Sequence, residues 1–340
     1  MKRLIFAQAL ARAAMAFSLA VCAQAQTFSE KTPSGLSQLA ELNASDSGGI
    51  GSGFGDAIAM SGDTIVVGAP GAGAAYVFVK PASGWANMTQ TAELTPSDGG
   101  LALDFGLSVG ISGNTIVVGS YSHNAVYVFT QPQGGWKNMT ETAVLSNDNG
   151  VATLFGEWVA IDGNTIAVSE PKTFSYRGRV QVFTEPAGGW VSATPTGSII
   201  ASRRVQDLFG VAAAINGNTI VVGAQFKKKP TGAAYVFVEP ASGWKNMTQT
   251  GELSASNIAQ SSYFGNAVAI APATIAVGSA TSLTSGTVYT YAEPSGGWKN
   301  MLATSEVTVA GAEYGSAVAI SDTILAEGAD ADGVAYVFGP

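Results

Sequence analysis

Short apolar runs separated by glycine-rich turns recur along the chain at intervals of about 50 residues. Each of the six copies begins with an aromatic residue followed by glycine, and these aromatic residues are Phe54, Phe105, Phe155, Phe209, Phe264 and Tyr314. The runs are too short for amphipathic helices, and glycine or asparagine stands between them where hairpins turn. A period of this length built from several short strands is typical of β-propeller blades rather than of helical solenoids.

Within one copy, the pattern predicts four strands. Small residues at 57–59 fit the crowded centre of a propeller and predict the innermost strand. A tight turn at 61–63 leads to a continuous apolar run at 64–67, which predicts a strand covered on both faces. Alternating aromatics at 76–78 predict the third strand. The turn before Trp85 leads to the outermost strand, which ends at 92–94.

The two ends of the array complement each other. The sixth copy stops after Phe338 and lacks a fourth strand, whereas residues 38–42 resemble the fourth strand at 91–94. We therefore predict an all-β fold over residues 37–338: a six-bladed β-propeller of four-stranded antiparallel blades. We expect the N-terminal strand to complete the last blade, which would leave no open edge between first and last.

The Phe54-Gly55 pair followed by Val67-Gly68-Ala69-Pro70 resembles the FG-GAP repeat of integrin α-chain propellers, and is most similar to its bacterial secreted branch. The resemblance covers residues 37–338. It implies an extracellular adhesive or ligand-binding module without catalytic activity, and a seven-bladed integrin-like ring is the alternative to six blades. Integrin propellers carry an Asp-rich calcium loop between the first and second strands. Here that join is the short turn 61–63 with one carboxylate, too few ligands for calcium, so no cofactor is expected.

Residues 1–25 have the features of a secretory signal, with Lys2 and Arg3 before an apolar stretch and Ala23-Gln24-Ala25 at the cleavage site. Residues 26–36 are predicted to be a short linker. Val21 precedes Cys22, the only cysteine, and argues against a lipoprotein anchor there. We expect a secreted protein, extracellular or in the cell envelope, with no transmembrane segment and no disulfide.

The formal charge of the full chain is −8, and losing the basic residues of the signal makes it more negative. Phosphate would be repelled over most of such a surface, so nucleic acid is not an expected partner. The remaining cations are unevenly placed: eight of them lie within 172–229, in the predicted loops of the third and fourth copies. They are Lys172, Arg177, Arg179, Arg203, Arg204, Lys227, Lys228 and Lys229.

Because loops after second strands and loops between blades emerge on one face, we predict that these cations form one basic patch there, with Tyr176 or Phe174 available for stacking. The patch would bind an extracellular glycan or protein, especially an anionic one. A solvated loop cluster without a ligand is the alternative.

Two other functions remain open from the sequence. A carbohydrate-active enzyme, a lyase or glycosidase, would need acids near the propeller axis, where Glu157 is the candidate. A purely structural envelope or matrix role is the other. His123 is the only histidine, and no sequence motif supplies a Ser-His-Asp triad around it. Asp330 with Asp332 has calcium-like spacing, as an alternative to a turn role.

Several repeated residues have structural explanations. The tryptophans that follow the outer turns are predicted to pack on the blades rather than to bind sugars. They are Trp85, Trp136, Trp190, Trp244 and Trp298. Trp158 breaks the small-residue pattern of the innermost strands, either to fill the centre or to contact a ligand there. The Asn-Met-Thr triplets at 87, 138 and 246 fit the N-glycosylation pattern, but their repetition favours strand composition.

Overall fold

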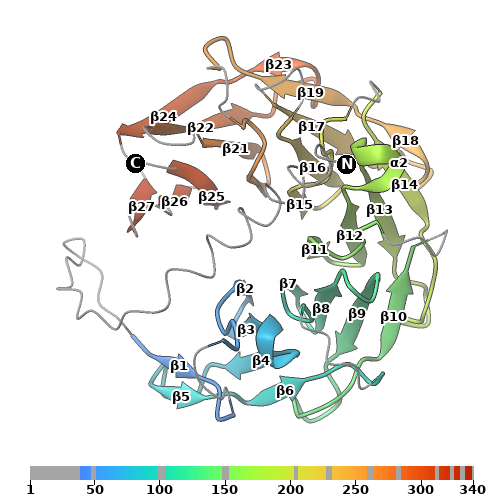
Figure 1. The fold of residues 1–340 in the computed structure, drawn as a ribbon, viewed down its shortest axis with the longest axis vertical. Coiled ribbons are helices and arrows are strands. Elements are labelled where there is room, and N and C mark those ends of the chain that lie inside the picture. The colour runs from blue at the N-terminus through green and yellow to red at the C-terminus, as the bar shows by residue number, and fades with distance from the viewer. Residues whose placement is uncertain are drawn as a thin grey trace, which may run out of the picture.

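The computed structural model describes residues 39–46, 51–98, 104–147, 153–202, 206–226, 232–258, 263–280, 285–310, 314–321, 325–329 and 334–338. The predicted signal and the predicted linker lie outside them. The structure is almost entirely β, and successive antiparallel sheets are arranged around a common centre (Figure 1). None of the helices in the described part of the chain is long and apolar enough to cross a bilayer.

Each of the first five sheets contains four strands of one repeat in the predicted order, and the third and fourth sheets gain a fifth, short strand from the next repeat. The first comprises β2 (Ala57–Ser61), β3 (Thr64–Ala69), β4 (Ala74–Val79) and β6 (Ala92–Leu94), and the second β7 (Ser108–Ser112), β8 (Thr115–Ser120), β9 (Ala125–Thr130) and β10 (Ala143–Ser146). The third comprises β11 (Val159–Asp162), β12 (Thr165–Glu170), β13 (Arg179–Thr184) and β14 (Gly197–Ile200). The fourth comprises β15 (Ala213–Asn216), β16 (Thr219–Ala224), β17 (Ala233–Val238) and β19 (Gly251–Ser254). The fifth comprises β20 (Val268–Ala271), β21 (Thr274–Ala280), β22 (Ser285–Ala292) and β24 (Ser305–Ala310).

The described part of the sixth sheet contains β25 (Tyr314–Ile320), β26 (Leu325–Ala329) and β27 (Val334–Phe338). In the first five sheets, the strand of small residues lies nearest the centre and the fourth strand lies at the rim (Figure 1). The propeller-type architecture is therefore confirmed, whereas the number of blades in a closed ring stays a prediction.

The Phe-Gly pair joins neighbouring sheets through a close backbone contact. Gly106 has a φ of 97°, and a Cβ on it would lie 2.6 Å from the carbonyl oxygen of Ala74 in the preceding sheet. A Cβ on Gly68 of β3 would in turn meet the Gly106 carbonyl at 1.8 Å. Only glycine allows both the left-handed backbone and this approach. The repeated Phe-Gly and Val-Gly pairs thus set the packing distance between sheets.

The phenylalanine of each motif packs on the aromatic residues of the third strand. The ring centroid of Phe105 lies 5.3 Å from that of Tyr127 and 6.2 Å from that of Phe129, both in edge-on geometry. All three side chains are buried. The structural role predicted for the repeated tryptophans is confirmed for the buried set, which comprises Trp136, Trp190, Trp244 and Trp298, while Trp85 is half-buried. Aromatic burial is therefore a large part of each sheet's core.

A hydrogen-bonded clamp repeats at the rim. The side-chain oxygen of Asn138 accepts a 2.9 Å hydrogen bond from the backbone N–H of Glu93, in the outer strand of the preceding sheet. Asn246 accepts from Ser198, and Asn300 from Glu252, in the same way. At the clamps, β18 (Met247–Thr248) pairs in parallel with β14, and β23 (Met301–Leu302) with β19. The asparagine of the Asn-Met-Thr triplets therefore has an inter-sheet role that the sequence did not reveal.

We expect Asn138→Ala to lower the free energy of unfolding by about 1 kcal/mol, because the Glu93 N–H loses its acceptor at a partly solvated rim. Chemical denaturation followed by tryptophan fluorescence would measure the change. Asn138→Asp keeps the accepting oxygen and is the matched control, with an expected loss below that of the alanine variant. Equal stability of all three proteins would show that the clamp contributes nothing.

The N-terminal segment occupies a rim position on the first sheet. β1 (Leu42–Asn43) pairs in parallel with β5 (Met88–Thr89), and the N–H of Glu41 donates to Asn87 at 2.8 Å. This is the same clamp that outer strands make on the sheet that follows them. Among the described residues, β1 pairs only with β5, and it lies away from β25–β27 (Figure 1). The predicted pairing of this segment with the last blade therefore stays a prediction.

Candidate functional site

The third sheet departs from the others by a charged pair inside its core. Glu170 at the end of β12 lies opposite Arg179 at the start of β13, and both are buried. In the fourth sheet the same register position is occupied by Ala224 and Ala233. A buried ion pair seldom stabilises a fold more than well-packed apolar residues of similar volume do. The presence of the pair in one sheet therefore points to a role in positioning the adjoining loop.

Four side chains donate hydrogen bonds to the Glu170 carboxylate. Asn147 and Gln181 donate through their amide nitrogens at 3.1 and 3.0 Å. Arg179 donates through Nε, which makes the ion pair, and Thr153 donates through its hydroxyl. Arg179 and Gln181 lie on β13, whereas Asn147 and Thr153 lie in the connection between the second and third sheets. The carboxylate therefore ties the base of the β12–β13 loop to its neighbours.

The β12–β13 loop has an unusual backbone. It contains the short helical turn α2 (Thr173–Tyr176), in which Phe174, Ser175 and Tyr176 have φ values of 53°, 60° and 67°. Left-handed backbone costs a non-glycine residue about 1–3 kcal/mol where the surroundings impose it. Three such residues in succession make this loop a candidate for function rather than a simple connection.

Contacts on both sides hold this loop. The Lys172 N–H donates to the Thr153 carbonyl at 3.3 Å, in the connection from the second sheet, and the Tyr176 carbonyl accepts from Leu208 at 3.1 Å, in the connection to the fourth. Loops of neighbouring sheets thus share one face, as predicted. We call residues 172–177 the aromatic turn, since Phe174 and Tyr176 are about half-exposed on it. Lys172 and Arg177 are exposed beside them.

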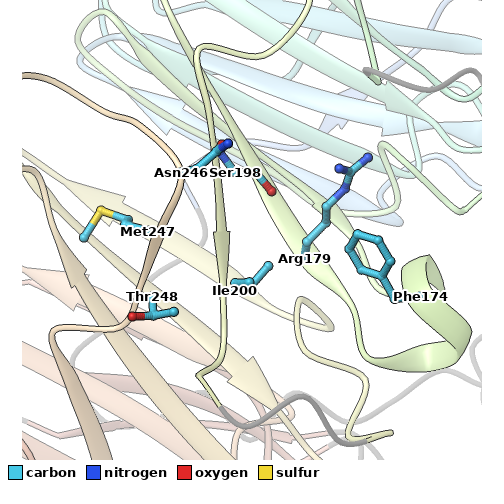
Figure 2. Close-up of a pocket in the computed structure, with 7 residues that line it drawn as sticks. All are labelled: Phe174, Arg179, Ser198, Ile200, Asn246, Met247 and Thr248. Carbon is cyan, nitrogen blue, oxygen red and sulfur yellow. The ribbon is translucent and has the colours of Figure 1, made fainter.

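A cavity of about 400 Å³ opens next to the aromatic turn. Figure 2 shows Phe174 and Arg179 on one side of it, Met247 and Thr248 on the other, and Ile200 between them. Ser198 and Asn246 complete the lining. The guanidinium carbon of Arg179 lies 5.7 Å from the centre of the Phe174 ring, a cation–π contact that orients the ring over the cavity. The site thus combines one aromatic wall with a few polar groups.

The predicted basic patch is only partly described by the structure. Lys172, Tyr176 and Arg177 are exposed on the aromatic turn, as expected. Arg179 is a correction: it is buried, because its guanidinium neutralises Glu170 inside the sheet. The other five predicted cations lie outside the described residues: Arg203, Arg204, Lys227, Lys228 and Lys229.

Asp104, Ser120 and His123 come together in the second sheet without forming a catalytic triad. The Ser120 hydroxyl donates to Asp104 at 2.8 Å, and its oxygen lies 3.1 Å from Nδ1 of His123. Asp104 also accepts from the Ser122 N–H at 2.6 Å. In a triad the histidine lies between the serine and the carboxylate, whereas here the buried serine lies between the histidine and the carboxylate. The arrangement stabilises the β8–β9 loop, and we assign it no catalytic role.

Glu157 and Trp158 lie at the inner end of the third sheet. Burial raises the pKa of the half-buried Glu157 carboxyl to about 7, against a lowering influence from Lys172. Trp158 is about half-exposed, so it does not fill the centre as a buried side chain would. Its backbone N–H donates to the Ser169 hydroxyl at 2.9 Å. The candidate acid and the exposed indole are thus adjacent on the loop side of β11.

The acidic residues between sheets have a structural partner where they are described. Asp98 accepts a 2.6 Å hydrogen bond from the hydroxyl of Tyr127, in the third strand of the next sheet. Asp148, Asp330 and Asp332 lie outside the described residues. Within the described ranges, no three acidic or histidine side chains gather in a way that could hold a metal ion.

Radially arranged antiparallel sheets with an elaborated loop face define a propeller-type repeat protein whose candidate site lies on its third sheet. The family model of the FG-GAP repeat matches residues 36–78, 88–129, 201–237 and 247–291, and the chain is an FG-GAP repeat protein. Such repeats form propellers that often act as binding modules and are usually non-enzymatic. A search of curated proteins gave no match.

The four matched segments end or begin on either side of residues 130–200, so the third sheet lies outside them. That sheet carries the Glu170 network, the aromatic turn and Trp158. Part of this difference is visible in the sequence, where Glu170 ends a run that elsewhere ends in alanine or serine. The left-handed turn and the buried partner of Glu170 had no sequence signal.

Proposed function

We propose that this protein is a secreted binding module that recognises an anionic glycan through the aromatic turn and the adjoining cavity. The observation that carries the proposal is the strained turn itself, which presents Phe174 and Tyr176 half-exposed, with exposed Lys172 before them and exposed Arg177 after them. Aromatic faces stack on sugar rings, and cations pair with the carboxylate or sulfate groups of acidic sugars.

The size of the cavity favours a glycan, rather than the broad surface of a protein, as the binding partner. Its volume of about 400 Å³ is at the small-molecule end of binding sites, enough for one or two sugar residues. Ser198, Asn246 and Thr248 contribute polar groups to its lining (Figure 2). The acidic character of the whole chain makes a local cationic site more selective, because anions are repelled elsewhere on the surface.

Secretion is part of the proposal and rests on the predicted signal over residues 1–25.

The Glu170 network supports the site from beneath, since it fixes the two strand ends between which the turn is built. A rigid scaffold lowers the entropy lost when a flexible glycan binds. The turn's two anchors to neighbouring loops act in the same direction.

We expect the double variant Phe174→Ala/Tyr176→Ala to lose at least ten-fold in affinity for acidic glycans on a glycan array. Stacking contributes about 0.5–1.5 kcal/mol per aromatic pair beyond area burial, and two rings are removed. Val191→Ala removes a comparably exposed apolar side chain from the connection between β13 and β14, at the end of β13 away from the turn, and should bind normally.

The charge contribution is tested separately with Arg177→Ser. Lys137→Ser, at an exposed cation of the second sheet, is the matched control. The arginine variant should lose affinity for acidic glycans, and its retention on neutral glycans should equal that of the wild type. A wild-type protein that is retained on no glycan of the array, or aromatic variants that bind as the wild type does, would overturn the proposal.

A further inference from the structure

The carboxyl group of Glu157 lies where loops of the second and third sheets meet, next to the aromatic turn. Its backbone N–H closes a tight turn onto the Leu154 carbonyl at 3.1 Å, so the residue is held in place. Lys172 of the aromatic turn interacts with it electrostatically. Within the described residues no ion pair joins the two, so the Lys172 ammonium is not fully engaged by this acid.

Trp158, the next residue, gives this position its second unusual feature. The corresponding residues of the first, fourth and fifth sheets are Ala57, Ala212 and Ala267, so the repeat needs no large side chain here for packing. The indole is instead about half-exposed. Backbone hydrogen bonds bring the three residues together from two loops, because the Lys172 N–H donates to Thr153 and the Glu157 N–H donates to Leu154. An exposed aromatic ring, a carboxyl group and an ammonium group are the side-chain types of a sugar-binding subsite.

We propose that Glu157, Lys172 and Trp158 form a subsite for a sugar carboxylate, such as that of a uronic acid, and that it is occupied while Glu157 is protonated. The inference rests on the proposed function and names the acidic group of its ligand. A protonated carboxyl donates a hydrogen bond to the ligand carboxylate, Lys172 supplies the compensating charge, and the indole faces the ring. Ionised Glu157 would repel the same carboxylate.

The other titratable groups near Glu157 do not reproduce this behaviour. Tyr121, on the β8–β9 loop, has its pKa raised by burial and then by Asp104 and Glu157, so its phenol stays neutral in this range. Asp104 is buried and accepts hydrogen bonds from Ser120 and Ser122. His123, on the same loop, is bonded to Ser120 and serves as the control below.

The sign of the pH dependence follows from the pKa of about 7. Glu157 is almost fully protonated at pH 5.5, and about 3% protonated at pH 8.5. Affinity falls with the fraction of binding-competent protein, so binding should be about 30-fold weaker at pH 8.5. The measurement is calorimetric titration of the secreted protein with an oligogalacturonate hexamer, and with its methyl ester, at both pH values.

Three variants identify the group responsible. Glu157→Gln keeps a hydrogen-bond donor that cannot ionise, so its affinity for the hexamer should vary less than three-fold between the two pH values. His123→Gln removes the only imidazole and should keep the wild-type dependence. Lys172→Met should weaken hexamer binding about ten-fold at pH 5.5 and leave binding of the methyl ester unchanged.

The outcomes separate this inference from the proposed function. Hexamer binding with no pH dependence, a dependence that survives Glu157→Gln, or one that disappears in His123→Gln overturns the carboxylate subsite alone. If the wild type binds neither the hexamer nor any acidic glycan of the array at pH 5.5, the proposed function fails and the subsite fails with it. Thermal melting of each variant shows whether a lost signal reflects loss of folding.

Discussion

Glu170→Ala is expected to lower the free energy of unfolding by about 3–5 kcal/mol, because it leaves the Arg179 guanidinium buried without its counter-charge. Asn147 and Gln181 lose a hydrogen-bond acceptor at the same time. Urea denaturation followed by tryptophan fluorescence measures the loss.

The repeat supplies a matched control for this experiment. The double variant Glu170→Ala/Arg179→Ala creates the alanine pair that the fourth sheet already contains at 224 and 233. It should recover at least half of the stability lost in the single variant, because no charge remains buried. The recovered protein should still bind glycan weakly, since the base of the aromatic turn is no longer fixed. Losses that simply add in the double variant, or a single variant as stable as the wild type, would contradict this account.

Met60→Asp is expected to lower the free energy of unfolding by about 2–4 kcal/mol, although Met60 is 66% exposed in the structure. Ile58 and Met60 of β2 are 65% and 66% exposed, whereas the corresponding Val109 and Ile111 of β7 are 8% and 7% exposed, because they face the sheet before them. A closed ring would cover β2 with the sixth sheet in the same way. The cost of a buried carboxylate then appears only if the ring closes.

Two further variants calibrate the result. Ile111→Asp places the same charge in an interface that the structure shows to be buried and should be strongly destabilising. Val191→Asp places it at an exposed position and should have almost no effect. If Met60→Asp behaves as Val191→Asp does, the sixth sheet does not cover β2 and the ring is open.

A cross-link tests the same closure directly. In the first sheet, Val77 of the third strand pairs with Ala92 of the fourth, and the corresponding positions for closure are Val337 and Ala40. Cys22, the only natural cysteine, lies in the predicted signal, so Ala40→Cys/Val337→Cys would carry the only two thiols of the secreted protein. Mild oxidation should produce an intramolecular disulfide, detected by a mobility shift, whereas Ala40→Cys/Ala326→Cys should not.

Local pattern predicts most of the fold because each strand follows from a few neighbouring residues. The turn at Gly113, with a φ of 54°, required a residue that tolerates left-handed backbone, and the run after it required cover on both faces. Burial of Trp136 and of the Phe105 ring also follows from the repeat, since the same contact is made in sheet after sheet. Such features do not depend on which other parts of the chain lie nearby.

The candidate site depends on neighbours that are distant in sequence. Arg179 belongs to a cluster of cations, and only the pairing of β12 with β13 places it opposite Glu170 and removes it from the surface. The left-handed turn at 174–176 contains no glycine, so its conformation comes from the loops that hold it. The asparagine clamps likewise join residues more than 40 positions apart.

The sequence by itself determined the repeat, its four strands and the glycine turns, because these arise from side-chain size and backbone conformation within one copy. Only the tertiary structure decided what the third sheet presents, because a charge becomes a buried anchor or an exposed contact according to its partner across the sheet. Arg179 is buried in an ion pair with Glu170 and does not belong to the exposed basic patch. Lys172 and Arg177 remain at the surface with two aromatic rings.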